Sequence, residues 1–235
     1  MAVITISREF GSGGDEVASR LCEVLNYHSF GKLQILQAAK ESTLSKNNAV
    51  DYSEDNHEVQ SFLDRLGGRS ASTVQKIAWS ENPSIASRPE QADVHDSAVL
   101  SLVKRAIQAA GSAGNMVIIG RGGQVLLKDT PGVLHVRIEA PVEMRIERVK
   151  QQLKKEPNAS QSEGNLARAA SDIIANRDLA SADYIKRFFN VDWHDPRLYH
   201  LVLNLGKLNV EQAVQIILAG VHTLELRAVE PTTPY

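Results

Sequence analysis

A glycine-rich stretch near the N-terminus has the residue types and the spacing of a phosphate-binding turn. Residues 8–15 read Arg-Glu-Phe-Gly-Ser-Gly-Gly-Asp, and they follow the apolar, β-branched run at 2–6. Apolar residues then recur at helical spacing over 17–25. Glycines allow backbone N–H groups to approach an anion closely, and the N-terminus of a helix attracts negative charge. We therefore predict a strand, a glycine turn and a helix that together bind phosphate.

This turn departs from the common pattern G-x-x-x-x-G-K-[ST], in which a lysine and a hydroxyl group serve the terminal phosphate and Mg2+. If Gly13 is the second glycine of the pattern, Gly14 takes the place of the lysine and Asp15 that of the hydroxyl residue. We expect Arg8 to supply the missing cation, because a guanidinium can bind two phosphate oxygens at once. Asp15 would repel phosphate unless Mg2+ lies between them. The alternative is a tight turn that needs its glycines for geometry alone.

A second glycine-flanked cation follows the strong apolar run at 116–119. Gly120, Arg121 and Gly122 would lie at the carboxyl edge of a parallel sheet, where ligands bind in open α/β sheets. Because the glycines let the backbone approach a ligand, we predict that Arg121 binds an anionic group. The alternative is a surface arginine at the end of a strand.

Composition and charge limit the kinds of partner that this chain can have. The 235 residues are 43% hydrophobic and 23% charged, and 26 basic against 28 acidic side chains give a net charge of -2. No overall positive field therefore attracts nucleic acid or an anionic membrane. The single cysteine, Cys22, fits a reducing compartment, and no apolar stretch reaches the roughly 20 residues of a membrane span. We predict a cytoplasmic protein with no nucleic-acid or membrane partner, and a homodimer stays open.

The order of the predicted elements favours an α/β fold with a parallel sheet. Strands are predicted at 2–6, 116–119, 134–138 and 201–204, and patterned helices at 17–25, 98–110, 142–153 and 210–217. Residues 27–95 are polar and weakly patterned, which indicates a helical insertion, and residues 151–190 are also polar, charged and weakly patterned. We predict a single domain over 1–222 and a flexible tail over 223–235.

Motifs spread along most of the chain resemble the cytidylate kinase-like family. They are Ile-Ser-Arg-Glu-Phe-Gly-Ser-Gly-Gly at 6–14, Ile-Ile-Gly-Arg-Gly at 118–122, Phe-Asn-Val-Asp-Trp at 189–193 with Asp195, Pro196 and Tyr199, and Leu-Val-Leu-Asn at 201–204 with Gly206. The resemblance implies a P-loop kinase-type fold, in which helices flank a parallel β-sheet, 27–95 is a helical acceptor-binding insertion and 151–190 is a lid. It also implies ATP and Mg2+ as cofactors, nucleotides as substrates, and phosphoryl transfer to a nucleoside monophosphate such as CMP or dCMP.

The residue types and the resemblance together give the predicted site. Catalytic candidates are Arg8, Arg177 and Arg187; donor-binding candidates are Arg8, Gly11, Ser12, Gly13, Gly14, Asp15 and Glu16; acceptor-binding candidates are Gly120, Arg121 and Gly122. No side chain is assigned as a metal ligand, since no histidine pair has the i, i+4 spacing of a zinc site. The aromatic residues at 188–199 could stack on a base or anchor a helix, and we favour anchoring.

The chain also departs from its relatives at several of these positions. Glycine stands at 31 where relatives carry aspartate, Ile119 and Gly122 replace two aspartates of the true cytidylate kinases, and Ala180, Ser181 and Ala182 stand where further arginine is expected. Two alternatives to the cytidylate-type kinase therefore stay open. One is a nucleotide- or phosphate-binding protein without turnover, and the other is a kinase of another small-molecule acceptor.

Overall fold

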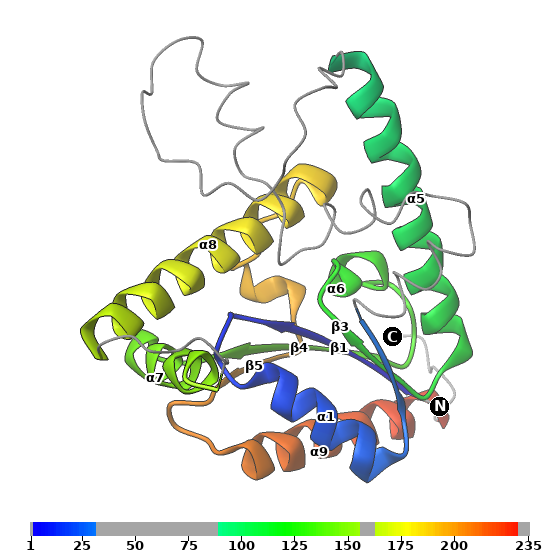
Figure 1. Cartoon of the computed structure of the whole chain (residues 1–235). Helices are drawn as coiled ribbons and strands as arrows, with labels where there is room; N and C mark the ends of the chain where they lie inside the picture. The colour runs from blue at the N-terminus through cyan, green and yellow to red at the C-terminus, as the bar shows by residue number, and fades with distance from the viewer. Residues whose placement is uncertain (1, 32–88, 156–162, 230–235) are drawn as a thin grey trace.

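A five-stranded parallel sheet lies at the centre of the computed structural model, which describes residues 2–31, 89–155 and 163–229 (Figure 1). The strands are β1 (Val3–Arg8), β2 (His28–Phe30), β3 (Met116–Ile119), β4 (Val133–Glu139) and β5 (Leu201–Asn204). They lie in the order β2-β3-β1-β4-β5, and all four pairings are parallel. The carboxyl ends of all five strands therefore meet at one edge of the sheet.

β1 is the middle strand of this sheet, and its composition follows from that position. Residues 3–7 are all buried, because helices cover both faces of the strand. Ile4 and Ile6 belong to the core on one face, whereas Val3 belongs to the core on the other. The strand ends at Arg8, so the glycine turn begins at the centre of the carboxyl edge.

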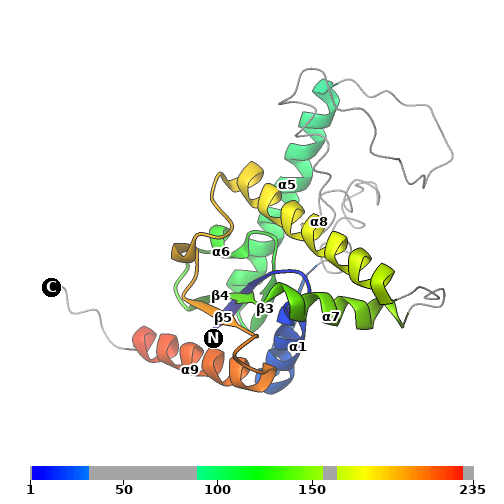
Figure 2. The same cartoon turned by 90° about the vertical axis from the view of Figure 1, so that its left-hand side faces the viewer.

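Helices pack on both faces of the sheet and beyond its carboxyl edge (Figures 1 and 2). They are α1 (Gly14–Leu25), α5 (Pro89–Ala113), α6 (Gly123–Leu126), α7 (Val142–Leu153), α8 (Glu163–Phe189) and α9 (Val210–Val229), with a 3-10 helix at Pro196–Leu198. α1 and α9 bury one face, and α5 and α6 bury the other. α7 and α8 pack against each other on the side toward which β1 and β4 point. This last pair is therefore placed to contact the glycine turn.

The structure confirms the predicted parallel α/β sheet flanked by helices, but it differs from the predicted boundaries in three places. Residues 28–30, at the start of the predicted insertion, form strand β2; two of its three residues are exposed, so no apolar alternation marked them. The helix predicted at 98–110 begins at Pro89, a residue type that suits the first position of a helix. The prediction missed its first turns because their polar sequence carries no apolar spacing. The last helix continues to Val229, so residues 223–229 are helical and not a tail.

The predicted lid and insertion are described only in part. Residues 163–189 form one continuous helix, α8, within the predicted lid. The remaining parts of these predictions at 32–88 and 156–162, and the end of the chain at 230–235, lie outside the described residues. Within the described ranges, no helix combines the length and the apolar character needed to traverse a lipid bilayer.

Candidate functional site

The glycine turn has the backbone geometry of an anion cradle. Gly11 and Gly13 have φ angles of 75° and 93°, a left-handed conformation that glycine adopts without steric strain. Gly13 is the N-cap of α1, and no described side chain caps this helix end. The N–H of Val17 is the first to reach a helical carbonyl, that of Gly13. The preceding N–H groups of the first turn lack intrahelical partners and can bind an anion.

Arg8 lies across the position that lysine occupies in the common pattern. A Cβ atom built on Gly14 would be 2.5 Å from Cβ of Arg8 and 2.9 Å from its Cγ. The stem of Arg8 thus fills the space into which a side chain at position 14 would extend. Its Nε donates to Oδ1 of Asp15 at 2.9 Å, so the guanidinium lies beside the helix N-terminus. The glycine at 14 and the arginine at 8 are therefore sterically complementary.

A small cavity of about 120 Å3 opens over this turn. It is lined by residues 8–11 and 13–16 and by Arg148 and Gln152 of α7. Pockets that hold a whole ligand of nucleotide size usually exceed about 300 Å3. The cavity therefore has the size of a subsite for phosphate groups. Ser12 beneath it is fully buried, and its Oγ has no hydrogen-bond partner among the described residues.

Arg148 is a cation of this site that the sequence interpretation missed. Its Nη1 donates to the carbonyl of Ser12 at 2.7 Å and lies 3.4 Å from that of Gly11. Its Cζ is 3.4 Å from the place of a Cβ on Gly13, so the guanidinium covers the turn. The helix that carries Arg148 follows β4, a strand adjacent to β1. A cation on the helix that follows a neighbouring strand is placed near the carboxyl edge, and this position could have indicated Arg148 from the sequence.

The Arg121 turn lies at the end of β3, next to β1. Gly120, Arg121 and Gly122 have φ angles of 67°, 63° and 73°, and a left-handed arginine is uncommon. Arg121 is only 4% exposed, and the N–H of Gly120 donates to the carbonyl of Ile6. A Cβ on Gly122 would be 2.4 Å from the Phe189 ring. β1 and the end of α8 therefore hold this turn from two sides.

The structure places the two candidate arginines of α8 at different points of the site. Arg177 lies over the ring of Phe10, with its Cζ 5.5 Å from the ring centroid, and so reaches the glycine turn. Arg187 lies over the ring of Phe188 at 5.2 Å, in the last turn of α8. The structure thus brings Arg177, and not Arg187, to the glycine turn.

The aromatic segment after α8 anchors the chain to the sheet, as predicted. Trp193 is 1% exposed, and its Nε1 donates to Oγ of Ser7 at 2.8 Å. The buried Arg137 of β4 lies 4.3 Å from the centroid of this indole ring and donates to the Trp193 carbonyl. Burial alone would lower the pKa of Arg137, but Glu139 and Tyr199 keep its pKa above the ordinary value. Trp193 is therefore unavailable as a platform for a base.

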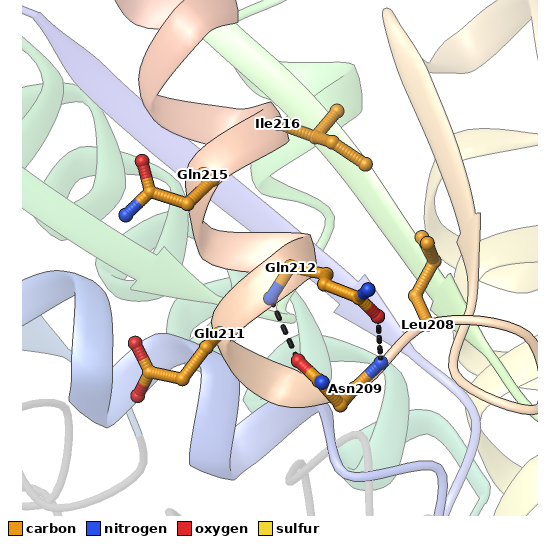
Figure 3. A pocket seen from close by; sticks show the side chains of 6 residues that line it. All are labelled: Leu208, Asn209, Glu211, Gln212, Gln215 and Ile216. Atoms are coloured by element: carbon orange, nitrogen blue, oxygen red, sulfur yellow. Dashed lines mark hydrogen bonds between the residues drawn. The ribbon is translucent and has the colours of Figure 1, made fainter.

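A shallow apolar depression on α9 lacks the features of a catalytic site (Figure 3). Its side chains come from one helix and the turn before it: Leu208, Asn209, Glu211, Gln212, Gln215 and Ile216. The side chains of Asn209 and Gln212 each accept from the other's backbone N–H, which is a capping box at the start of α9. These polar groups are therefore engaged in holding the helix end.

Comparison with known proteins identifies the family of this chain. The model of the cytidylate kinase-like family matches residues 3–207, most of the chain. This chain belongs to the cytidylate kinase-like family. It is 24% identical to a cytidylate kinase from Methanosarcina barkeri over 155 residues, which cover 66% of this chain and 81% of the relative.

A solved structure shares the fold of this cytidylate kinase-like chain. An uncharacterized protein from Eubacterium ventriosum is similar with a TM-score of 0.61 and 18% identity, over 95% of this chain and 99% of that protein. A shikimate kinase from Bacteroides thetaiotaomicron is similar with a TM-score of 0.47 and 10% identity, over 94% and 98% of the two chains. The first of these similarities shows a shared fold and nothing further.

The cytidylate kinase-like family is a family of nucleotide kinases, and kinases in general use ATP and Mg2+. The residues of the glycine turn fit the phosphates of ATP, because left-handed glycines, a helix N-terminus and two arginines surround one phosphate-sized cavity. The Asp15 side chain is 71% exposed, and a carboxylate oxygen is a suitable ligand for Mg2+.

Proposed function

We propose that this protein transfers a phosphoryl group from ATP to a nucleoside monophosphate such as CMP or dCMP. One observation carries the proposal: the glycine turn and the Arg121 turn follow β1 and β3, which are neighbouring strands paired through Ile6 and Ile119. Two anion sites at adjacent strand ends suit a reaction in which two phosphorylated molecules meet.

On the donor side, the protein would orient the phosphates of ATP and offset their negative charge. The N–H groups at the start of α1 and the guanidinium of Arg8 would bind the terminal phosphates of ATP, and Asp15 would hold Mg2+. Bound Mg2+ would offset the negative charge of the phosphates. Arg148 would keep the turn in its cradle shape through the carbonyls of Gly11 and Ser12.

On the acceptor side, Arg121 would orient the phosphate of the nucleoside monophosphate. Arg177 would approach the transferred phosphoryl group from α8, because it already lies beside Phe10. Phosphoryl transfer needs little covalent chemistry from the protein, so orientation and charge neutralisation supply the rate enhancement. Exclusion of water by α7 and α8 would favour transfer over hydrolysis.

The test is a coupled assay of the purified protein with ATP, Mg2+ and each nucleoside monophosphate in turn. We expect turnover with CMP or dCMP, and no turnover with any of them would refute the proposal. Arg8→Ala should weaken ATP binding by about 10- to 100-fold, the contribution of a charge-assisted hydrogen bond to phosphate. Arg20→Ala is the matched control, since Arg20 is on α1 but pairs with Glu23 and Glu211 away from the cavity. Equal ATP affinity of the two variants would exclude Arg8 from the donor site.

A second candidate function is a nucleotide- or phosphate-binding protein without turnover. The ion pair between Arg8 and Asp15 favours it, because the carboxylate neutralises the cation that would bind phosphate. If the coupled assay shows no turnover, calorimetry with ATP and with CMP distinguishes the second candidate, which predicts binding, from a protein that binds neither nucleotide. Binding without turnover would support the second candidate, whereas turnover with an acceptor other than a nucleotide would identify a kinase of another small molecule.

A further inference from the structure

Phe10, the residue of the glycine turn that precedes Gly11, is held on both sides of its backbone by side chains from distant helices. Its N–H donates to Oδ1 of Asp178 on α8 at 2.9 Å. Its carbonyl accepts from Nε of Arg145 on α7 at 2.8 Å. The second carboxylate oxygen of Asp178 pairs with Nη2 of Arg145. Asp178 and Arg145 thus form a clamp around one residue of the chain.

The clamp is largely buried, and its one arginine faces two carboxylates. The side chains of Arg145 and Asp178 are 6% and 22% exposed. Nη1 of Arg145 lies 3.4 Å from Oε2 of Glu9, which also accepts from the N–H of Ala140 at the end of β4. In such surroundings the stability of each charged side chain depends on its partners, because removal of one charge leaves the others buried without a compensating charge or water. The clamp therefore fixes a single arrangement of the turn.

The clamp also sets the position of Arg177 relative to the donor phosphates. Arg177 is the neighbour of Asp178 on α8, and it lies over the Phe10 ring. One residue of the turn therefore contacts α8 through its backbone and through its side chain. An apolar cluster of Val149, Ala170 and Ile174, against which Phe10 packs, joins α7 to α8 beside it. Any displacement of α8 would move Phe10 and the start of the cradle.

We propose that Asp178 is a positioning residue that couples the glycine turn to α8, so that donor binding and the placement of Arg177 form one linked equilibrium. The inference rests on the proposed function, since it assigns ATP to the glycine turn. Asp178 takes no part in the reaction itself. It acts through the Phe10 amide and through Arg145.

Asp178→Asn is the first test, because it keeps the shape of the side chain and removes its charge. In the protein without nucleotide, we expect faster hydrogen exchange in peptides that cover 8–16. We also expect ATP affinity to fall about tenfold or more, a usual size for coupling between sites, while CMP affinity stays within about twofold. Asp172→Asn is the matched control, since Asp172 is an exposed carboxylate on the same helix. Wild-type exchange and affinity in Asp178→Asn would overturn the proposal.

A triple variant separates positioning from charge balance. Asp178→Leu/Arg145→Met/Glu9→Gln replaces all three charges of the clamp by uncharged side chains of similar volume, which usually preserves folding. If Asp178 positions the turn, this variant melts near the wild-type temperature yet keeps fast exchange at 8–16 and weak ATP binding. Recovery of both properties would show that only charge balance mattered, and would overturn the proposal. If the wild type binds no ATP, the proposed function fails, and exchange in the nucleotide-free protein still decides whether Asp178 holds the turn.

Discussion

Replacement of Gly14 by alanine tests whether Arg8 fills the place of the missing lysine. Gly14 is the first residue of α1. Alanine is favoured over glycine within a helix by up to about 1 kcal/mol, so the change alone would stabilise the protein. In this chain the new Cβ would be 2.5 Å from Cβ of Arg8, and both atoms are close to the backbone. We therefore expect the opposite sign.

The magnitude follows from these two opposing effects. Overpacking of this kind costs about 1–3 kcal/mol, and the helix preference offsets up to about 1 kcal/mol of it. Gly14→Ala should therefore lower the free energy of unfolding by up to about 3 kcal/mol. In an Arg8→Gly background the contacting atoms are gone, and the Cβ of Ile138 lies 3.4 Å from the new Cβ, which is ordinary van der Waals contact. There the same change should raise the free energy of unfolding by up to about 1 kcal/mol.

The assay is urea unfolding of the four proteins of this double-mutant cycle. We expect a coupling energy of about 1–3 kcal/mol between positions 8 and 14. Gly164→Ala is the matched control: Gly164 lies in the first turn of α8, and apart from its own helix no atom of the described residues lies within 4 Å of its Cβ position. Stabilisation by Gly14→Ala equal to that of Gly164→Ala, or additivity within about 0.5 kcal/mol, would refute the steric reasoning.

Three further changes probe other parts of the fold. Burial lowers the pKa of His135 from 6.5 to about 4, so as the pH falls the unfolded chain binds the proton before the folded protein does. Denaturant unfolding between pH 6.5 and pH 4 should therefore show that the free energy of unfolding falls by up to about 3 kcal/mol through this group. A difference in stability between wild type and His135→Gln that does not change over this pH range would contradict the prediction. Gly122→Ala combines a φ of 73° with a clash against Phe189, so denaturant unfolding should show a loss of at least about 2 kcal/mol, and an unchanged midpoint would exclude the contact. Asn209→Ala removes one half of the capping box and should lower the free energy of unfolding by about 1 kcal/mol, as measured by calorimetric melting. An unchanged melting temperature would show that Gln212 alone caps the start of α9.

The parts of the site that were predictable from the sequence are those encoded over a few neighbouring residues. The run at 2–6, the glycines after it and the helical spacing that follows identified β1, the glycine turn and α1. The glycines around Arg121 identified the second turn in the same way. Local backbone preferences determine such features, so a short stretch of sequence suffices to find them.

The side chains that hold the site could not be predicted, because their roles depend on the order of the strands. Arg145 and Arg148 contact the glycine turn only because β4 lies beside β1. Arg137 resembled an ordinary polar residue of an alternating strand, and its burial against Trp193 depends on the segment after α8. β2 was missed because its three residues carry too little apolar pattern.

The hydrogen bond between Phe10 and Asp178 joins residues 168 positions apart, and that separation has a consequence during synthesis. At about 5–20 residues per second, a ribosome needs roughly 10–30 s to add the second partner after the first. The glycine turn thus leaves the exit tunnel well before the helix that supplies its partner Asp178. A nascent chain that stalls before α8 carries the glycine turn without the Asp178 side chain that holds the Phe10 amide.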